Sequence, residues 1–359
     1  MPGKALAVVS GKGGSGKTII ATEIAVLLAQ AKTVKNIVLV DADLGTAGLS
    51  LYLGVNEVRT DSRGLSTVIL EGARESRFVV SIDGLLKPLR SFRSDNLGTE
   101  PRISLLPVGD FKSVNNEFRR TWAESGYSTD HRTTIALVDA LKHVISELKA
   151  TADMVIVDCR GGIDDESIAV CKTVDDIILI GEMDTTSFDA GLNLIEIFSD
   201  GKLVQKVKGL IFNKIYRNPE VIRHNAPGQY ETDILATIPF DLAAARAFTT
   251  GNIPSTSSPF GVHVQDAINR AYPDLIDAPP EAKIWKPGDF DAVNVFTPGA
   301  MRAGIVGALI LFTISVAAVF GIAFTPAISQ GATAAIAGAI GIVGAVLVAL
   351  VPLRVRRGR

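Results

Sequence analysis

Apolar runs and helix-like spacing alternate along most of the chain. Continuous apolar runs bounded by polar or glycine-rich turns are typical of strands covered on both faces of a parallel sheet. Such runs predict strands at residues 5–9, 36–41, 103–108, 153–158, 176–180, 207–213 and 235–238. Apolar residues at helical spacing predict helices at residues 19–28, 64–72, 133–148, 187–198 and 261–271. The alternation predicts an α/β fold with a doubly wound, mostly parallel sheet, and the polar residues 109–132 predict a surface excursion.

The pattern changes toward the C-terminus, where two long apolar segments follow a proline-rich stretch. Residues 303–324 and 334–351 contain no charged residue, and each is close to the roughly 20 residues that a helix needs to cross a bilayer. Neither has the polar stripe that core helices normally keep, so we expect a transmembrane hairpin, with a buried helical pair in a soluble core as the alternative. The expected organisation is a globular domain at 1–272, a linker at 273–301, the hairpin at 302–353 and a basic tail at 354–359.

The charged residues indicate the orientation of this hairpin and one class of partner. Every charge from Arg302 onward is positive, and the loop at residues 325–333 carries none. Positive charges favour the cytoplasmic side, so we expect a multi-pass protein of the cytoplasmic (inner) membrane with its N-terminal domain and C-terminus in the cytoplasm. Five of the 36 basic residues lie in this part, which leaves 31 basic against 38 acidic residues at positions 1–301. Because nucleic-acid binding needs a clustered basic face, no specific nucleic acid is expected as a partner.

A glycine-rich loop between the first expected strand and helix carries the most specific motif. Its residues are Gly11, Lys12, Gly13, Gly14, Ser15, Gly16, Lys17, Thr18 and, at the start of the helix, Ile19. Glycines let the backbone N–H groups of such a loop point at a polyphosphate, and the following helix N-terminus adds partial positive charge. Lys17 is then placed to neutralise the β- and γ-phosphates, and the Thr18 hydroxyl to ligate Mg²⁺. The alternative is a glycine-rich turn without a ligand.

Carboxylates end two of the expected buried strands. Asp41 and Asp43 close the apolar run at 36–41, and Asp158 ends the run at 153–158. Asp158 is interpreted as the Walker B residue, which holds Mg²⁺ through water. Hydrolysis needs an acceptor near the attacking water, and the carboxyl end of a strand beside the phosphates is where that acceptor must lie. Carboxylates at strand ends are also common helix caps, which is the structural alternative.

The second lysine of the loop carries a family resemblance. Lys-Gly-Gly-x-Gly-Lys-Thr, with Lys12 ahead of Lys17, is the deviant Walker A motif of the MinD/ParA family of P-loop ATPases, which residues 4–271 resemble. The resemblance implies hydrolysis of ATP and a homodimer formed around the nucleotide, with Lys12 reaching the nucleotide of the partner. A solvated loop charge is the alternative for Lys12.

The same resemblance implies roles for residues outside the loop. It makes Asp43 the residue that positions or activates the attacking water, and Asp41 part of the Mg²⁺ and water shell. It further implies that Gly162 offers its N–H to the γ-phosphate. Asn213 corresponds to the family's base contact, and Pro239 to the turn whose backbone flanks the adenine.

Two positions refine this comparison. A GTPase would carry Asn-Lys-x-Asp, whose aspartate accepts protons of guanine, and Tyr216 stands at the place of that aspartate, which favours ATP. Arg160 stands where the family usually has proline, which removes a fixed φ and adds a cation beside the nucleotide. An arginine finger and an ion pair with a nearby carboxylate are both open for Arg160.

The function expected from these residues is that of a membrane-anchored ATPase switch that recruits or positions an unidentified protein partner. Three alternatives stay open. A bacterial tyrosine kinase shares the Walker motifs and a membrane hairpin, although the five tyrosines of this chain form no cluster. The others are a DNA-partitioning ATPase and a non-hydrolysing, nucleotide-dependent scaffold.

Overall fold

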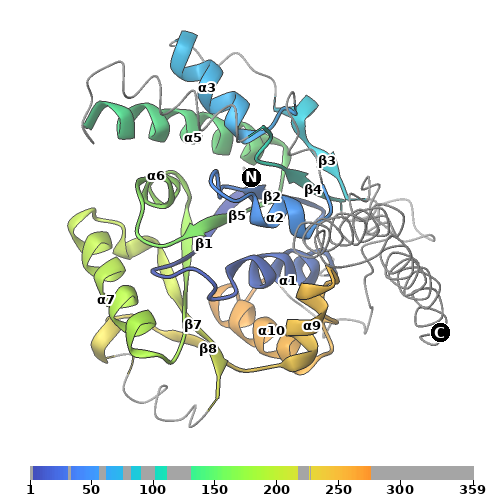
Figure 1. Cartoon of the computed structure of the whole chain (residues 1–359), viewed down its shortest axis with the longest axis vertical. Coiled ribbons are helices and arrows are strands. Elements are labelled where there is room, and N and C mark those ends of the chain that lie inside the picture. Colours follow the sequence, from blue (N-terminus) through green and yellow to red (C-terminus); the bar gives the residue numbers. More distant parts are fainter. Residues whose placement is uncertain are drawn as a thin grey trace, which may run out of the picture. The chain divides into compact units, whose positions relative to one another are not determined.

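Strands and helices alternate along the described part of the chain (Figure 1). The computed structural model describes residues 3–30, 34–55, 62–75, 82–89, 102–110, 131–216, 226 and 228–275. The strands are β1 (Lys4–Ser10), β2 (Asn36–Asp41), β3 (Lys87–Pro88), β4 (Arg102–Leu106), β5 (Met154–Gly161), β6 (Asp176–Gly181), β7 (Val207–Ile215) and β8 (Ile234–Pro239). The α-helices are α1 (Lys17–Gln30), α2 (Gly48–Tyr52), α3 (Leu65–Glu75), α5 (His131–Thr151), α6 (Asp165–Thr173), α7 (Thr185–Asp200), α9 (Leu242–Thr249) and α10 (Pro259–Ala271).

These strands form one eight-stranded sheet in the order β3-β4-β2-β5-β1-β6-β7-β8. β3 is antiparallel to β4, and every other neighbouring pair is parallel. The order reverses around β1, because β2 lies on one side of it, beyond β5, and β6 lies on the other. The predicted doubly wound, mostly parallel sheet is therefore confirmed.

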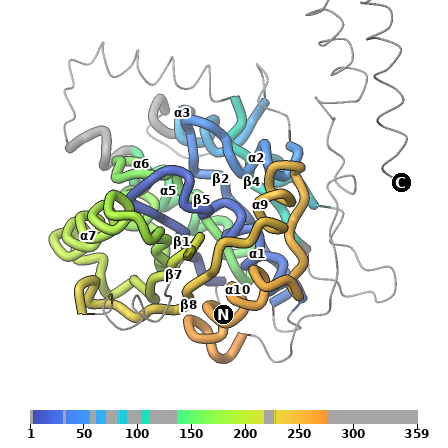
Figure 2. Tube along the Cα trace, turned by 60° about the horizontal axis from the view of Figure 1, so that its bottom comes forward, coloured from blue at the N-terminus to red at the C-terminus, as the bar shows by residue number. Residues whose placement is uncertain are grey.

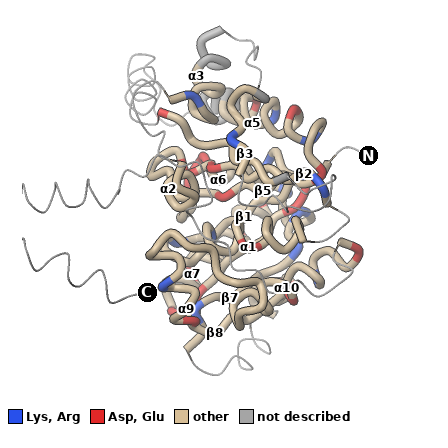
Figure 3. Tube along the Cα trace, turned by 90° about the vertical axis from the view of Figure 1, so that its right-hand side faces the viewer, with Lys and Arg blue, Asp and Glu red and all other residues tan. Residues whose placement is uncertain are grey.

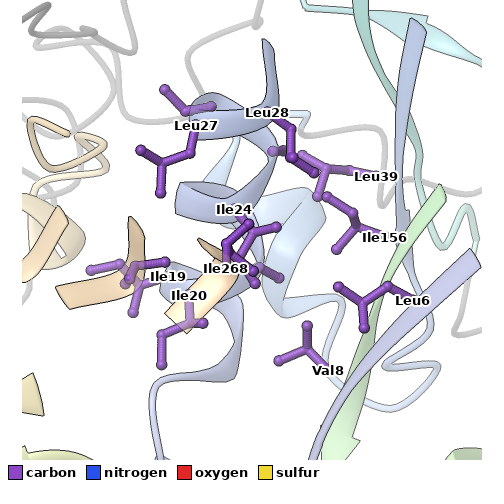
Figure 4. Close-up of a cluster of buried hydrophobic side chains, with 14 of the residues drawn as sticks. Leu6, Val8, Ile19, Ile20, Ile24, Leu27, Leu28, Leu39, Ile156 and Ile268 are labelled. Carbon is purple, nitrogen blue, oxygen red and sulfur yellow. The ribbon is translucent and has the colours of Figure 1, made fainter. Parts of the chain in front are cut away.

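Alternate residues of the strands bury a core on each face of the sheet. On one face, α1 and α10 pack against strand residues such as Leu6, Leu39 and Ile156, and Figure 4 shows Ile24 of α1 and Ile268 of α10 within this cluster. On the other face, α3, α5, α6 and α7 cover the intervening strand residues. Since both faces are covered, the strands read as continuous apolar runs, which is the signal that predicted them.

Short elements are the ones that the periodic pattern did not predict. They are β3, α2, α6 and α9. The helices α6 and α9 begin at side-chain caps: the Asp164 carboxylate accepts from Ser167 N (2.8 Å), and that of Asp241 accepts from Ala243 N (2.7 Å). Such helices depend on capping more than on an apolar stripe, so the spacing of hydrophobic residues does not predict them.

Several predictions fall on other parts of the chain. Most of the expected surface excursion at 109–132 and of the linker at 273–301 lies outside the described residues, as do the whole hairpin at 302–353 and the tail at 354–359. Among the helices that the structure describes, none combines the length and the apolar character needed to span a bilayer.

A carboxyl group is buried in the middle of α1. Glu23 has no exposed surface, and within the described part of the chain neither of its oxygens has a hydrogen-bond partner. Burial raises the pKa of Glu23 from 4.5 to about 8. An unpaired carboxylate is unfavourable in such surroundings, so the folded protein holds Glu23 as the neutral acid at neutral pH.

We expect Glu23 to make the folded state less stable as pH rises. The unfolded chain ionises near pH 4.5 whereas the folded chain keeps the proton up to about pH 8. The contribution of Glu23 to the free energy of unfolding is therefore full below the lower value, falls by up to about 1.4 kcal/mol per pH unit and levels off above the upper one. The isosteric change Glu23→Gln should remove this slope in thermal unfolding between pH 5 and pH 8.5. The exposed Glu147→Gln is the control, and a slope that survives Glu23→Gln would contradict the assignment.

Candidate nucleotide-binding site

The carboxyl ends of the central parallel strands meet at one edge of the sheet. The glycine-rich loop leaves β1 there and enters α1, and Figures 1 and 2 both show this chain between α7 on one side and α9 on the other. Asp41 at the end of β2 is the register partner of Asp158 in β5. The fold therefore brings the loop and the two predicted metal-binding carboxylates to the same edge.

The loop is held from the outside by two residues of β7. Asn213 Nδ2 donates to Ser15 O (2.9 Å), and Lys214 Nζ donates to Gly14 O and to Glu182 Oε1 (2.8 Å). Gly16 has a φ of +92°, and a Cβ there would lie 2.3 Å from Asn213 Nδ2. Only glycine accepts both conditions, so the loop backbone is fixed before any ligand arrives.

The lysine of the motif lies inside this loop. Lys17 is 6% exposed, and its Nζ donates to Ser10 Oγ (3.0 Å), which also accepts from Ser15 Oγ (2.9 Å). Burial lowers the pKa of Lys17, and the neighbouring Asp158 carboxylate acts in the opposite direction. A phosphate group is the partner that such a desolvated ammonium group lacks.

The predicted metal residues lie next to one another. Thr18 Oγ1 donates to Asp158 Oδ2 (2.7 Å), while Asp158 Oδ1 is buried and has no hydrogen-bond partner in the described part. Burial and the charge of Asp41 raise the pKa of Asp158 to about 7, and burial raises that of Asp41 to about 6. A hard cation reduces both the repulsion between the two carboxylates and the cost of burying their charges. Hydroxyl and carboxylate oxygens are the ligands that Mg²⁺ prefers.

The number of protein ligands also fits Mg²⁺. The described residues include no group of three or more histidine, cysteine, aspartate or glutamate side chains placed to hold a metal ion. Mg²⁺ keeps several waters and is usually bound through one or two carboxylates together with substrate phosphates. The residues present therefore fit a magnesium ion that arrives with a nucleotide.

The predicted water-activating carboxylate is engaged in a turn. Asp43 Oδ1 accepts from the N–H groups of Gly45 (3.2 Å) and Thr46 (3.0 Å), and its Oδ2 accepts from the Thr46 hydroxyl. The exposed Arg160 lies over this turn, since a Cβ on Gly45 would be 3.2 Å from its Cζ. Burial raises the pKa of Glu166 to about 7, and the positive charge of Arg160 acts in the opposite direction. No described carboxylate lies within ion-pair distance of Arg160, so the ion pair considered for this residue is not formed with the described part of the chain.

Two further predicted residues have partners within the subunit. Lys12 Nζ lies 3.0 Å from both carboxylate oxygens of Asp184, the residue that caps α7. Hydrogen bonds from Thr186 and Lys12 hold the pKa of Asp184 well below its ordinary value. The Gly162 N–H donates to Ser10 O (3.1 Å). In this conformation neither Lys12 nor the Gly162 amide is free for a phosphate.

A pocket of about 300 Å³ opens beside the loop. Six of its lining residues belong to the predicted site: Gly14, Gly16, Lys17, Thr18, Ile19 and Asn213. The other wall is mostly apolar and includes Phe240, Ala244 and Phe248. Pro239 precedes this wall without lining the pocket, and Tyr216 stacks on Phe240 with 5.1 Å between ring centroids. A mostly apolar pocket of this volume next to a phosphate loop has the size and chemistry for a purine base.

Comparison with known families identifies the domain. Residues 6–254 match the family model described as the CobQ/CobB/MinD/ParA nucleotide binding domain. The chain belongs to this family. The glycine-rich loop, Asp41 and Asp158 all lie inside the matched region, so the nucleotide-binding family and the geometry of the pocket agree.

Curated relatives of this CobQ/CobB/MinD/ParA-family protein are distant. The chain is 26% identical over 219 residues to an uncharacterized ATP-binding protein of Methanocaldococcus jannaschii, covering 59% of this chain and 64% of the relative. It is 27% identical over 200 residues to the antiactivator FleN of Pseudomonas aeruginosa, covering 55% of this chain and 57% of that protein. The chain thus spans less than two thirds of the length of either relative.

Solved structures show the same fold. The septum site-determining protein MinD of Pyrococcus horikoshii, complexed with Mg-ADP, superposes with a TM-score of 0.52 at 20% identity, covering 75% of this chain and 96% of that one. At this level of identity the comparison establishes the fold alone. The chemistry of this family member has to be argued from its own residues.

The structure adds residues that sequence patterns did not single out. They are Ser10, which contacts Lys17; Ser50, which contacts Asp41; Asp184, which pairs with Lys12; and Lys214, which holds the loop. Lys214 had a local signal, because it follows Asn213 at the end of β7, and so did Ser10, which directly precedes the loop. Ser50 lies nine positions after Asp41 in a short helix, and Asp184 meets Lys12 at a separation of 172.

The support that Lys214 gives the loop leads to a measurable effect on nucleotide affinity. We expect Lys214→Met to weaken binding of Mg-ADP about tenfold, because the Gly14 carbonyl and Glu182 both lose a charged donor. Isothermal titration calorimetry measures this, with thermal unfolding to show that the fold is retained. Lys214→Arg keeps a cation at this position and should retain most of the affinity. Equal affinities of Lys214→Met and the parent protein would show that the loop needs no such support.

Proposed function

We propose that the chain is a membrane-anchored ATPase that binds Mg-ATP, dimerises around it and hydrolyses it to ADP and phosphate, and so acts as a switch that recruits or positions a protein partner. The observation that supports it most is the fixed phosphate loop beside two buried carboxylates, one of which has an unpartnered oxygen. A catalytic role for Lys12, Lys17 and Asp43, and binding roles for the other predicted residues, belong to this proposal.

The nucleotide lies along the loop in this proposal. Gly13 and Gly14 are exposed, and a Cβ on either would meet no described atom within 4 Å, which leaves room for phosphates above the loop. The adenine occupies the pocket between Asn213 and the aromatic wall, with the backbone at Pro239 near its edge. Phe240 offers a ring on which either purine can stack, and the absence of an aspartate at position 216 favours adenine over guanine.

Thr18, Asp41 and Asp158 hold Mg²⁺ in this proposal, directly or through water. When bound, the ion neutralises charge on the phosphate oxygens and orients them. The Thr18 hydroxyl would ligate the ion through an oxygen lone pair while it still donates its proton to Asp158 Oδ2, and the unpartnered Asp158 Oδ1 would be left for the ion or one of its waters. The site is thus ready for a cation without movement of the strands.

Asp43 orients the attacking water and accepts its proton. Its carboxylate is presently bound by the hydroxyl and N–H of Thr46, so that turn must loosen before the carboxylate serves as a base. Gly162 must likewise exchange the Ser10 carbonyl for the γ-phosphate. Both changes are small rearrangements at loop positions beside a fixed phosphate site.

Lys12 completes the site of a second subunit in this proposal. Its partner Asp184 is 40% exposed at the side chain, as is Lys12 itself, and half-exposed ion pairs are weak. The neighbouring residues Ile163 and Met183 are each 40% exposed. Apolar side chains beside a weakly held lysine support a face that a second copy of the chain covers.

The C-terminal hairpin at residues 303–324 and 334–351 anchors the protein in the inner membrane, with residues 1–272 in the cytoplasm. Its support is the uncharged length of both segments and the positive charges that flank them. Such an anchor does not release, so ATP controls dimerisation and partner recruitment and leaves attachment unchanged.

A DNA-partitioning role is the second candidate, and charge disfavours it. Figure 3 shows basic and acidic residues interspersed along the described chain in that view, and positions 1–301 carry more acidic than basic residues. Nonspecific DNA binding depends on clustered positive charge. The name FleN belongs to an antiactivator, which fits a partner that is a protein.

Attachment to the membrane should not depend on the nucleotide. We expect the full-length protein to sediment with the membrane fraction in the presence of ATP, in the presence of ADP and after nucleotide is removed, because both apolar segments stay inserted. A chain that ends at residue 275 should be found in the supernatant. Release of the full-length protein upon nucleotide removal would rule out a permanent anchor.

One set of variants distinguishes the proposed roles of Asp43, Lys17 and Lys12. Asp43→Ala should bind ATP, lose at least about 100-fold in phosphate release and accumulate as a dimer, because the water is no longer activated. Lys17→Ala should lose nucleotide binding. Adding Lys12→Ala to Asp43→Ala should abolish the dimer and keep ATP bound, because only the contact across the interface is removed.

Light scattering of the detergent-solubilised protein measures the dimer, and a phosphate-release assay measures hydrolysis. Lys4→Ala, which removes an exposed lysine at the opposite end of β1, is the matched control. Hydrolysis at the normal rate by Asp43→Ala would show that this carboxylate is not the acceptor. A dimer that persists in the double variant would show that Lys12 does not act across an interface.

A further inference from the structure

A serine in a short helix holds one of the metal-site carboxylates. Ser50 N and Ser50 Oγ both donate to Asp41 Oδ2, each at 2.7 Å, and Asp43 N donates to Asp41 Oδ1 (3.1 Å). Asp41 is fully buried and Ser50 is 1% exposed. Water therefore cannot replace these donors, and the orientation of the carboxylate depends on where α2 places Ser50.

The same hydroxyl is linked to a distant segment. Ser50 Oγ accepts from Val108 N (3.2 Å), and Val108 O accepts from both N (2.9 Å) and Oγ (2.5 Å) of Ser66 in the first turn of α3. Val108 and Ser66 are both fully buried. Every donor in the series points toward Asp41, and the two hydrogen bonds at Val108 use its N–H and its C=O, which belong to consecutive peptide groups.

We propose that Ser50 is a positioning residue for the magnesium site and that the series Ser66–Val108–Ser50 couples Asp41 to α3. This inference rests on the proposed function, since it assigns a means of regulation to the same site. Two donors on Oδ2 fix the plane of the Asp41 carboxylate, and Oδ1 with its single donor remains available toward the ion. The register pairing with Asp158 puts that carboxylate beside the residue with the unpartnered oxygen.

The helix that carries Ser50 is positioned by tertiary contacts, which are the Ser50 hydrogen bonds, the burial of Leu49 and the hydrogen bond from Tyr52 to Asn252 O. α2 has five residues, follows Ala47 at a φ of 54°, and has no side-chain cap at its N-terminus. Non-glycine residues rarely adopt such a φ, so α2 depends on tertiary contacts for its position. A shift of Asp41 toward a bound ion moves Ser50, and α2 moves with it.

The far end of the series holds the start of α3. The first N–H groups of a helix have no partner within the helix, and in α3 the amides of Leu65 and Ser66 donate to Pro107 O and Val108 O, each at 2.9 Å. α3 packs against α5 within the second core (Figure 1). A displacement of Val108 therefore loosens or tightens the first turn of α3, away from the nucleotide pocket.

Magnesium-dependent nucleotide affinity tests the positioning role in the full-length, detergent-solubilised protein. The dissociation constant for ADP is measured by calorimetry with Mg²⁺ and again with EDTA. Ser50→Ala should weaken binding about tenfold with Mg²⁺ and leave it unchanged in EDTA, because only the metal contribution is lost. Ser199→Ala, which removes an exposed serine hydroxyl in α7 outside the series, is the control and should match the parent protein in both conditions. Electron paramagnetic resonance of Mn²⁺ in place of Mg²⁺ should show weaker metal binding in Ser50→Ala and unchanged binding in Ser199→Ala.

Hydrogen exchange in peptides covering residues 62–75 tests the coupling. In the parent protein Mg-ADP should change the exchange rate of the α3 amides at least about threefold. Ser66→Ala should abolish this change and weaken Mg²⁺-dependent affinity less than Ser50→Ala does, because coupling between two sites is reciprocal. Ser50→Ala should abolish both the change and most of the Mg²⁺-dependent affinity.

Each result bears on a separate claim. Equal losses with Mg²⁺ and EDTA in Ser50→Ala, or no loss at all, would overturn the positioning role. An α3 response that survives in Ser66→Ala would overturn the coupling. A parent protein that binds no ADP in either condition would instead overturn the proposed function itself.

Discussion

Two carboxylates buried side by side govern this site. Asp41 and Asp158 end neighbouring parallel strands in register, and burial raises the pKa of both. Like charges that are removed from water repel one another strongly, so each carboxylate needs its own donors. Thr18 supplies one to Asp158, and α2 supplies two to Asp41 through Ser50. The phosphate loop, the start of α1 and the position of α2 are thus tied to one electrostatic constraint, which a divalent cation relieves.

The structure separates a rigid part of the site from a part that can change partners. Asn213 and Lys214 hold the loop backbone, and α1 behind it is buried on nearly every side. Lys12, Asp43 and Gly162 instead have partners of their own in the subunit. Preorganised donors suit tight binding of phosphates, whereas groups with an alternative partner suit a step that depends on the ligand. Nucleotide binding therefore depends on contacts that are fixed within the subunit, whereas the proposed hydrolysis and dimerisation depend on groups that must change partners.

Sequence patterns predicted the sheet, its larger helices and the phosphate loop because those features depend on local spacing. Buried strands read as apolar runs, and glycines mark where Asn213 and the loop approach closely. The patterns did not predict α2, α6 and α9, which depend on caps and tertiary contacts. They also missed Ser50 and Asp184, since Ser50 meets Val108 58 positions away and Asp184 meets Lys12 at a separation of 172. The spacing of hydrophobic residues along the chain gives no information about such contacts between distant positions.

The proposed permanent anchor would change what the ion pair between Lys12 and Asp184 has to accomplish. Two copies confined to one membrane meet at a far higher effective concentration than two copies free in solution. Under the proposed function, a membrane-bound ATPase would therefore need a means to stay monomeric without ATP. A half-exposed ion pair contributes at most about 1 kcal/mol, which is enough to disfavour exchange of Lys12 between subunits and small enough for a nucleotide phosphate to overcome. The weakness of this contact is thus what makes it suitable for a switch.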